Sequence, residues 1–330
     1  MTDTETTRDQ GGLAAFAPGA LDLTGHRLGV PQRAGALTMV PITGPAYPGI
    51  APPRSGLKLS RVAGYGRVEL RNGGDGVAIV PLHIGYIQDA AQNHALCRSA
   101  FIAPGATLMF EDACCVQESQ GGYLSGRDQW FFVLPAELRA RALELSGVQG
   151  YAKLWDDIAG LNRSYGLARR GHLEQILSRK RAVLTQFQSR LELQEGQLGA
   201  VFLLNGRFAG LELAPDPVYF AEVWMALVCF AYGAAAWRAE PAVADADPYE
   251  LEEGTGLAGL RAALERDRAE RMNDVALEVA TMPAGPVSLR EEERYLDLRL
   301  STVDAPHMTG QAVTDGDRTV YASLFARTAP

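Results

Sequence analysis

The 330-residue sequence has few cysteines, few histidines and none of the short motifs that mark common catalytic folds. Its four cysteines form no CxxC pair and no regular spacing, so neither a disulfide framework nor a structural zinc site is expected. Its five histidines show no HxH or HExxH arrangement, and we predict no bound metal and no other cofactor. GxGxxG, P-loop, GxSxG and protein-kinase motifs are also missing, so dinucleotide-fold, NTPase, hydrolase and kinase families are not indicated.

Basic residues are fewer than acidic ones, 31 against 39, which gives a net charge of −8 and a pI near 5.3. This balance disfavours a broad electrostatic surface for nucleic acid or anionic lipid, although a local basic patch stays open. The N-terminal MTDTETTRDQGG contains no apolar run of signal-peptide length. We expect residues 1–34 to be a disordered or loosely ordered leader and the protein to be soluble and cytoplasmic.

Only one long apolar run is present, residues 218–237, in which Glu222 is the single charged residue. As a helix it would span about 30 Å, the thickness of a bilayer core. Asp216 and Pro217 are typical of a helix start, and no second such run occurs. We therefore interpret the run as a central buried helix and expect no membrane partner.

Alternating apolar and polar residues with frequent glycines predict a β-rich first part. Apolar spacing predicts a helical middle, with the residues at 171–191 forming one long amphipathic helix. A charged helix is predicted at about 257–279, and hairpin turns at Asn205–Gly206 and Asp315–Gly316. The expected strands are 36–43, 58–62, 66–71, 77–82, 94–102, 107–117 and 294–302, and the other expected helices are 135–146 and 151–161.

This order of elements predicts an α+β fold. The N- and C-terminal strands are expected to share a sheet or sandwich around the helical middle, which includes the long buried helix. Residues 35–330 would form a single α+β domain, and a sub-boundary near residue 134 stays open.

Several stretches together resemble one prokaryotic family. AAQNHALCRSAFIAPGATLMFEDACCVQES carries Gln92, Asn93, Cys115 and Val116 of its motifs, and QEGQLGAVFLLNGRFAGLEL resembles its EGQ-G hairpin with an NG turn. GQAVTDGDRTVYASLF is similar to its closing hairpin, and LWDDIAGLNRS to a Trp-Asp helix. With these in order over about residues 35–327, the chain resembles the family called ARG and Rhodanese-Phosphatase-superfamily-associated protein domain.

The resemblance implies a link to nucleotide-derivative or ADP-ribose-related metabolism, or to conflict and repair systems, but no settled activity. The chain departs from the family pattern at three places. His94 stands where arginine is usual, GYIQ at 85–88 replaces a Gly-Glu-Glu stretch, and Tyr321 replaces a common histidine. If the family has a catalytic site on those groups, this member is expected to have altered or lost chemistry.

Cys115 is the candidate nucleophile, and Glu118 the candidate acid or base. A nucleophilic thiol needs a base or a positive field, which His94 and Arg98 on the neighbouring predicted strand would supply. A buried structural cysteine and an exposed solvated carboxylate are the alternatives. Strand alternation also predicts that Glu111 and Asp112 point to opposite faces.

Gln92 and Asn93, with His94 and Arg98, are the candidate ligand-binding residues, because amides suit a base or a ribose; they equally suit a turn. Three functions follow. The first is a binding or accessory protein that recognises a nucleotide, an ADP-ribose-type ligand or a protein partner. The second is an enzyme acting on a phosphorylated or ADP-ribose-type substrate through Cys115 and Glu118. The third is a structural subunit that forms a homo-oligomer.

Overall fold

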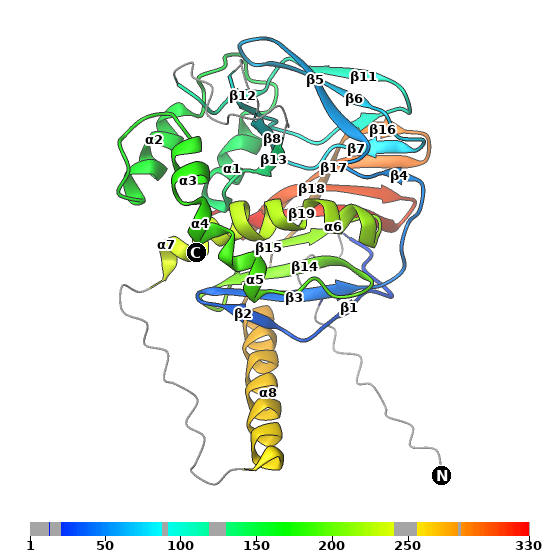
Figure 1. Cartoon of the computed structure of the whole chain (residues 1–330). Helices are drawn as coiled ribbons and strands as arrows, with labels where there is room; N and C mark the ends of the chain where they lie inside the picture. The colour runs from blue at the N-terminus through cyan, green and yellow to red at the C-terminus, as the bar shows by residue number, and fades with distance from the viewer. Residues whose placement is uncertain are drawn as a thin grey trace.

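A large antiparallel sheet forms the base of the protein (Figure 1). The computed structural model describes residue 13 and residues 21–87, 92–118, 130–240, 256–282 and 285–329. The sheet has the strand order β1-β3-β14-β15-β19-β18-β17-β16, and β2 pairs with β3. N- and C-terminal strands therefore share one sheet, as predicted for the α+β fold. Its strands are β1 (Arg27–Leu28), β2 (Gln32–Ala34), β3 (Leu37–Thr43), β14 (Gln197–Leu204), β15 (Arg207–Leu213), β16 (Ser288–Tyr295), β17 (Leu298–Asp304), β18 (Met308–Asp315) and β19 (Arg318–Ala326).

Strand alternation gives the sheet two apolar faces. Along β3, Leu37 and Met39 pack in one core with the helices, while Val40 and Ile42 pack in a second core on the opposite face. β1 and β2 fall within residues 1–34, which the sequence analysis assigned to a leader; residues 1–12 and 14–20 lie outside the described residues.

Both predicted hairpins are present, one of them with a shifted turn. The turn of β14–β15 lies at Asn205 (φ 48°) and Gly206 (φ 78°), the positive φ values of a type I′ turn. In β18–β19 the turn residues are Gly316 and Asp317, one residue later than predicted. The reason is that Asp315 still pairs with Arg318 in the ladder.

Three small sheets form a second layer, here called the β-lobe, above the large sheet in Figure 1. The sequence predicted continuous strands at 94–102 and 107–117. This was wrong, because each range contains two separate strands that belong to different sheets. His94 and Ala95 pair with β8 and β12, whereas Phe101 and Ile102 pair with β7. The strands are β4 (Ile50–Ala51), β5 (Leu57–Gly64), β6 (Arg67–Asn72), β7 (Val77–Ile79), β8 (Ile84–Ile87), β9 (His94–Ala95), β10 (Phe101–Ile102), β11 (Thr107–Phe110), β12 (Cys114–Cys115) and β13 (Trp130–Val133).

The apolar run 218–237 is a core helix, as predicted. It consists of α6 (Pro217–Met225), the π-helical η2 (Ala226–Tyr232) and α7 (Gly233–Ala239), and Asp216 caps it by accepting from Tyr219 N at 2.8 Å. By length and apolar composition, residues 217–239 would suffice to cross a membrane, but here most of them are buried against the sheet and neighbouring helices.

The predicted long helix at 171–191 was wrong: it is three short helices, α3 (Glu174–Arg179), α4 (Arg181–Leu184) and α5 (Gln186–Arg190). The breaks let the chain bend around the core helix while its apolar stripe stays buried. At one bend, Lys180 and Arg181 place their charges over Trp237 and Trp130, at 4.8 and 5.0 Å from the ring centroids.

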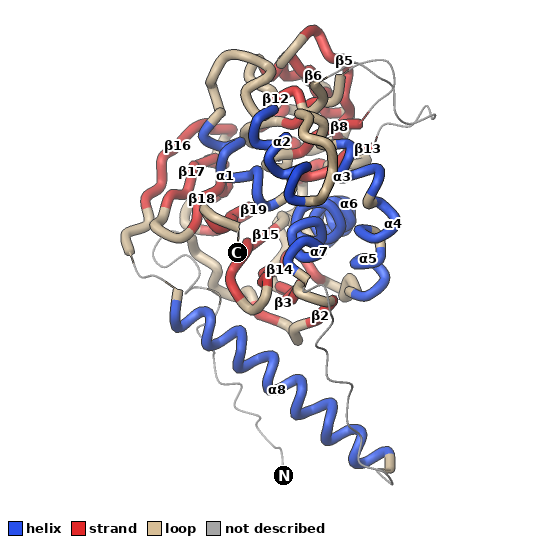
Figure 2. Tube along the Cα trace, turned by 90° about the vertical axis from the view of Figure 1, so that its left-hand side faces the viewer, coloured by secondary structure: helices blue, strands red, loops and turns tan. Residues whose placement is uncertain are grey.

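Two further helices, α1 (Ala136–Glu144) and α2 (Trp155–Ser164), lie beside the β-lobe. The predicted charged helix is α8 (Leu257–Thr281). Figures 1 and 2 show it projecting from the body, and Val275 is its one buried residue.

Candidate functional site

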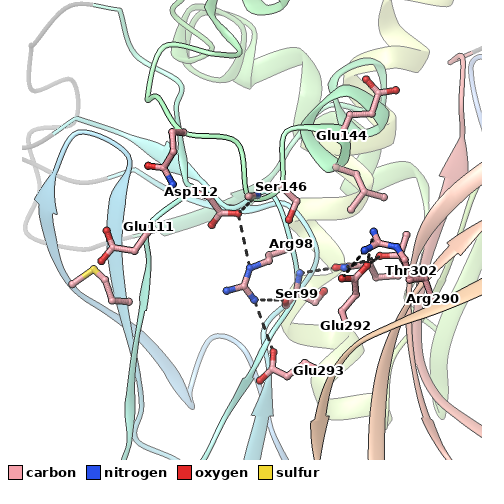
Figure 3. A pocket seen from close by; sticks show the side chains of 15 residues that line it. Arg98, Ser99, Glu111, Asp112, Glu144, Ser146, Arg290, Glu292, Glu293 and Thr302 are labelled. Carbon is pink, nitrogen blue, oxygen red and sulfur yellow. Dashed lines mark hydrogen bonds and ion pairs between the residues drawn. The ribbon is translucent and has the colours of Figure 1, made fainter.

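A cleft of about 710 Å³ lies between the β-lobe, the loop after α1, and the strands β16 and β17 at one end of the large sheet (Figure 3). Residues within 98–112, in the region where the sequence analysis expected ligand recognition, form one wall. The lining residues are Arg98, Ser99, Met109, Glu111, Asp112, Leu143, Glu144, Ser146, Gly147, Gln149, Arg290, Glu292, Glu293, Thr302 and Gln311.

Arg98 occupies the middle of this cleft. Its guanidinium stacks on Phe110, 5.1 Å from the ring centroid, and lies between two carboxylates. Nε is 3.9 Å from Asp112 Oδ2, and Nη1 is 3.9 Å from Glu293 Oε2. Because charge-assisted hydrogen bonds are usually about 2.7–2.9 Å long, these contacts leave guanidinium N–H groups available to a ligand. The side chain is 33% exposed, so a ligand can reach it.

Backbone contacts fix both carboxylates. Asp112 Oδ2 accepts from Gly147 N at 2.7 Å, and Glu293 Oε1 accepts from Phe101 N at 3.3 Å. Burial raises the pKa of Glu293, against the lowering effects of the Phe101 N–H and the Arg98 charge. The position of Arg98 is thus defined from both sides.

A chain of polar groups continues along the cleft from Ser99. Its backbone N donates to Gln311 Oε1 (2.7 Å), Gln311 Nε2 donates to Thr302 Oγ1 (3.3 Å), and Thr302 Oγ1 donates to Glu292 Oε1 (2.6 Å). The Ser99 hydroxyl is buried, 1% of the residue being exposed, and finds no hydrogen-bond partner among the described residues. A buried hydroxyl without a partner costs about 1–3 kcal/mol, which a polar ligand group or a water molecule would recover.

Lys153 holds the loop after α1 against the wall. Its ammonium donates to three backbone carbonyls, those of Asp112 (2.8 Å), Leu145 (2.8 Å) and Val148 (2.7 Å). Nothing in the local sequence indicated this role, because it depends on the loop after α1 folding onto Asp112, which is 41 positions away.

Glu111 and Asp112 both line the cleft, with Asp112 directed at Arg98 and Glu111 at the exposed Arg67. The Glu111 side chain is 55% exposed and that of Asp112 is 8% exposed, as expected for neighbours that point to opposite sides of the chain. Glu111 makes a two-pronged ion pair with the exposed Arg67, at 2.7 and 2.9 Å.

Gln92, Asn93 and His94 lie away from this cleft and are buried. Gln92 Nε2 donates to Gln117 O (3.3 Å), and Asn93 N donates to Gln117 Oε1 (3.1 Å). His94 Nε2 accepts from Gly66 N (3.1 Å), which leaves the proton on Nδ1 to be donated to Gln92 O (2.8 Å). Burial lowers the pKa of His94, so the ring is neutral at pH 7.

Cys115 lies opposite His94 in the antiparallel β9–β12 pair, the juxtaposition that the sequence analysis considered. The thiol is buried and donates to Gln117 O at 3.1 Å. Burial raises its pKa, more than hydrogen bonding to the Gln117 backbone and the Trp155 side chain lowers it. Glu118 Oε2 accepts from Gly171 N at 2.8 Å. The structure therefore gathers five of the six predicted residues in one region and separates Arg98 from them.

A buried ionic network, missed by the sequence analysis, lies beneath the β-lobe. Arg139 of α1 is fully buried and donates to Glu212 Oε1 (2.5 Å), Tyr232 Oη (2.9 Å) and Ser323 Oγ (2.5 Å), and to His83 Nδ1 at 3.3 Å. Burial, followed by the Arg139 charge, lowers the pKa of His83 well below its usual value, although the Cys97 backbone opposes this. The network joins α1, the core helix and the large sheet.

Gly210 provides the space for this network. A Cβ at this position would lie 2.0 Å from the Tyr232 hydroxyl oxygen, so any side chain would displace the tyrosine. Within the described ranges, no three histidine, cysteine or carboxylate side chains are grouped as metal ligands.

Fold and site define an α+β protein with a polar cleft between a large antiparallel sheet and a β-lobe. The chain matches the family model described as ARG and Rhodanese-Phosphatase-superfamily-associated Protein domain over residues 25–325, and it belongs to that family. No curated protein and no solved structure matches the chain.

Proposed function

We propose that the protein is a binding or accessory protein whose cleft takes a nucleotide or ADP-ribose-type ligand, with Arg98 contacting a phosphate group. The observation that carries this proposal is the state of Arg98. Its guanidinium is stacked on Phe110 and flanked by carboxylates at 3.9 Å, so it is oriented and still has donors to offer. Planar guanidinium groups bind phosphate through two parallel hydrogen bonds.

The rest of the cleft suits the sugar and the base. Carboxylates accept hydrogen bonds from ribose hydroxyls; Glu293 lies beside Arg98, and Glu292 lines the cleft next to Thr302. The Ser99 hydroxyl and the Gln311 amide add neutral donors and acceptors. Five carboxylates against two guanidinium groups line the cleft, a balance that favours a ligand with one or two phosphate charges over a triphosphate. The carboxylates are Glu111, Asp112, Glu144, Glu292 and Glu293.

An enzyme that uses Cys115 as nucleophile and Glu118 as acid or base is the alternative, supported by the register of His94 with Cys115. Two observations make us favour binding. The thiol pKa is raised, which disfavours the thiolate, and His94 Nε2 already accepts from Gly66 N. The family description, which records association with ARG and Rhodanese-Phosphatase-superfamily proteins, supports an accessory role beside such proteins. We propose a conflict or repair system as the setting.

The test is a calorimetric titration with ADP-ribose, after a thermal-shift screen that also includes NAD, AMP, ATP, cyclic dinucleotides and short RNA. We expect ADP-ribose or a monophosphate to bind, and Arg98→Met to weaken binding tenfold or more, because a charged hydrogen bond contributes about 1.5–3 kcal/mol. Arg61→Met is the matched control, since Arg61 forms an exposed ion pair with Glu69 in the same β-lobe. No binding by any compound, or equal loss in both variants, would contradict the proposal.

A further inference from the structure

Two cysteines that are 17 positions apart meet in the interior beside the cleft. Cys97 Sγ and Cys114 Sγ are 2.9 Å apart, and both residues are completely buried. Cys114 pairs with Ala95 in the β9–β12 ladder. Cys97 lies two residues after Ala95, and its thiol contacts the thiol of Cys114. A disulfide has an S–S bond of about 2.05 Å, so the sulfurs need to approach by only about 0.9 Å.

We propose that Cys97 and Cys114 are a redox-sensitive pair that closes to a reversible intrachain disulfide. With a peroxide as oxidant, one thiol loses its proton and its sulfur attacks a peroxide oxygen, giving a sulfenic acid and, from hydrogen peroxide, one water. The second sulfur loses its proton, attacks the first and releases the sulfenic oxygen as another water. The two thiols together lose two electrons and two protons, and hydrogen peroxide is reduced to two waters. A dithiol reductant reverses the change by thiol–disulfide exchange.

The surroundings predict that closure is slow but selective. The hydrogen bond to Cys97 and burial together raise the pKa of Cys114, and both cysteines are completely buried, so reaction waits for a local opening. Once one sulfur is oxidised, its partner at 2.9 Å is the nearest nucleophile. Cys115 points elsewhere, with its thiol donating to Gln117 O.

The disulfide would act on the cleft, a consequence that rests on the proposed function. Arg98 follows Cys97 directly, and Asp112 lies two residues before Cys114, so the closed loop contains the whole wall from Arg98 to Asp112. Drawing the two ends together brings Asp112 nearer to Arg98 and strengthens their ion pair. We expect fewer free guanidinium donors and several-fold weaker binding of ADP-ribose in the oxidised protein.

The test maps the cysteines of the folded full-length protein. Reduced protein is treated with hydrogen peroxide and unfolded in guanidinium with iodoacetamide, and its intact mass is measured by mass spectrometry. We expect two alkylated cysteines in place of four. After trypsin, the peptide 72–98, which contains Cys97, should be joined to the peptide 99–127, and dithiothreitol should release both.

Three variants identify the bond, because peptide 99–127 contains both Cys114 and Cys115. Cys97→Ala and Cys114→Ala should abolish the link, and Cys115→Ala, the matched control, should retain it; circular dichroism checks that each is folded. Four alkylated cysteines after oxidation, or a link through Cys115 or Cys229, would overturn the proposal. The mapping needs no ligand. If the Cys97–Cys114 bond forms but neither the reduced nor the oxidised protein binds ADP-ribose, the proposed function is contradicted and the disulfide proposal is not.

Discussion

Asp112 Oδ2 lies 3.9 Å from Arg98 Nε while accepting a hydrogen bond from Gly147 N at 2.7 Å. The carboxylate therefore joins the loop after α1 to the arginine that we propose contacts the ligand. Substituting Asp112 by asparagine would remove the negative charge and keep a side-chain oxygen that can accept the hydrogen bond from Gly147 N.

The first prediction concerns Asp112→Asn. Removing the negative charge frees Arg98 from one ion pair, so ADP-ribose should bind more tightly, by up to about fivefold for a part-exposed pair contributing about 0.2–1 kcal/mol. Isothermal titration calorimetry measures the change. Glu69→Gln is the control, since it removes the carboxylate beside Arg61 in the same lobe. Unchanged or weaker binding in Asp112→Asn would show that the carboxylate does not compete with the ligand.

The second prediction concerns Lys153→Met. Losing three charge-assisted hydrogen bonds leaves the carbonyls of Asp112, Leu145 and Val148 without their donor, and we expect the free energy of unfolding to fall by about 2–3 kcal/mol. Urea denaturation measures it. Lys58→Met changes an exposed lysine on β5 and should alter stability by less than about 0.5 kcal/mol. Equal effects in the two variants would remove the role assigned to Lys153.

The third prediction is a loss of stability below pH 6.5. His83 and His94 have pKa values lowered from 6.5, mainly by burial, so the unfolded chain binds protons that the folded chain does not. Their contribution is complete above about pH 6.5 and falls as the pH drops toward the folded pKa values. Asparagine tolerates the positive φ of 63° at position 83. In His83→Asn, the urea midpoint should therefore change less between pH 7.5 and 5.5 than it does in the wild type. An identical pH dependence in the variant would exclude His83 as a source.

Local signals account for what was predictable from the sequence. The turn at Asn205–Gly206 depends on two adjacent residues that tolerate positive φ, and the core helix depends on its own apolar run and the cap at Asp216. The pairing of the N- and C-terminal strands in one sheet followed from the order of elements. Family motifs pointed to residues 92–118, and part of this stretch forms a wall of the cleft.

The remaining features arise from contacts between distant segments. In the sequence, Lys153 is an ordinary lysine beside a helix, and its role depends on the loop folding onto Asp112. The spacing of Cys97 and Cys114 likewise does not indicate that their thiols meet. The division of the predicted strand 107–117 was not predictable locally, because it depends on β11 pairing with β6 and β12 pairing with β9. Arg139 is the clearest case, since its hydrogen-bond partners lie 56 to 184 positions away in sequence.

The last prediction tests that buried network. Glu212→Gln leaves the buried Arg139 guanidinium without its counter-charge, and Arg139→Met leaves the carboxylate alone, so each should cost about 3–5 kcal/mol of stability. The double variant should cost clearly less than the sum, because neither charge is then left unpaired. Urea unfolding at pH 7.5 gives the coupling energy. Arg141→Met with Glu144→Gln repeats the cycle on an exposed pair of the same helix, where coupling should stay below about 0.5 kcal/mol. Additive effects at Arg139 and Glu212 would mean that the pair does not stabilise the junction of α1 with the sheet.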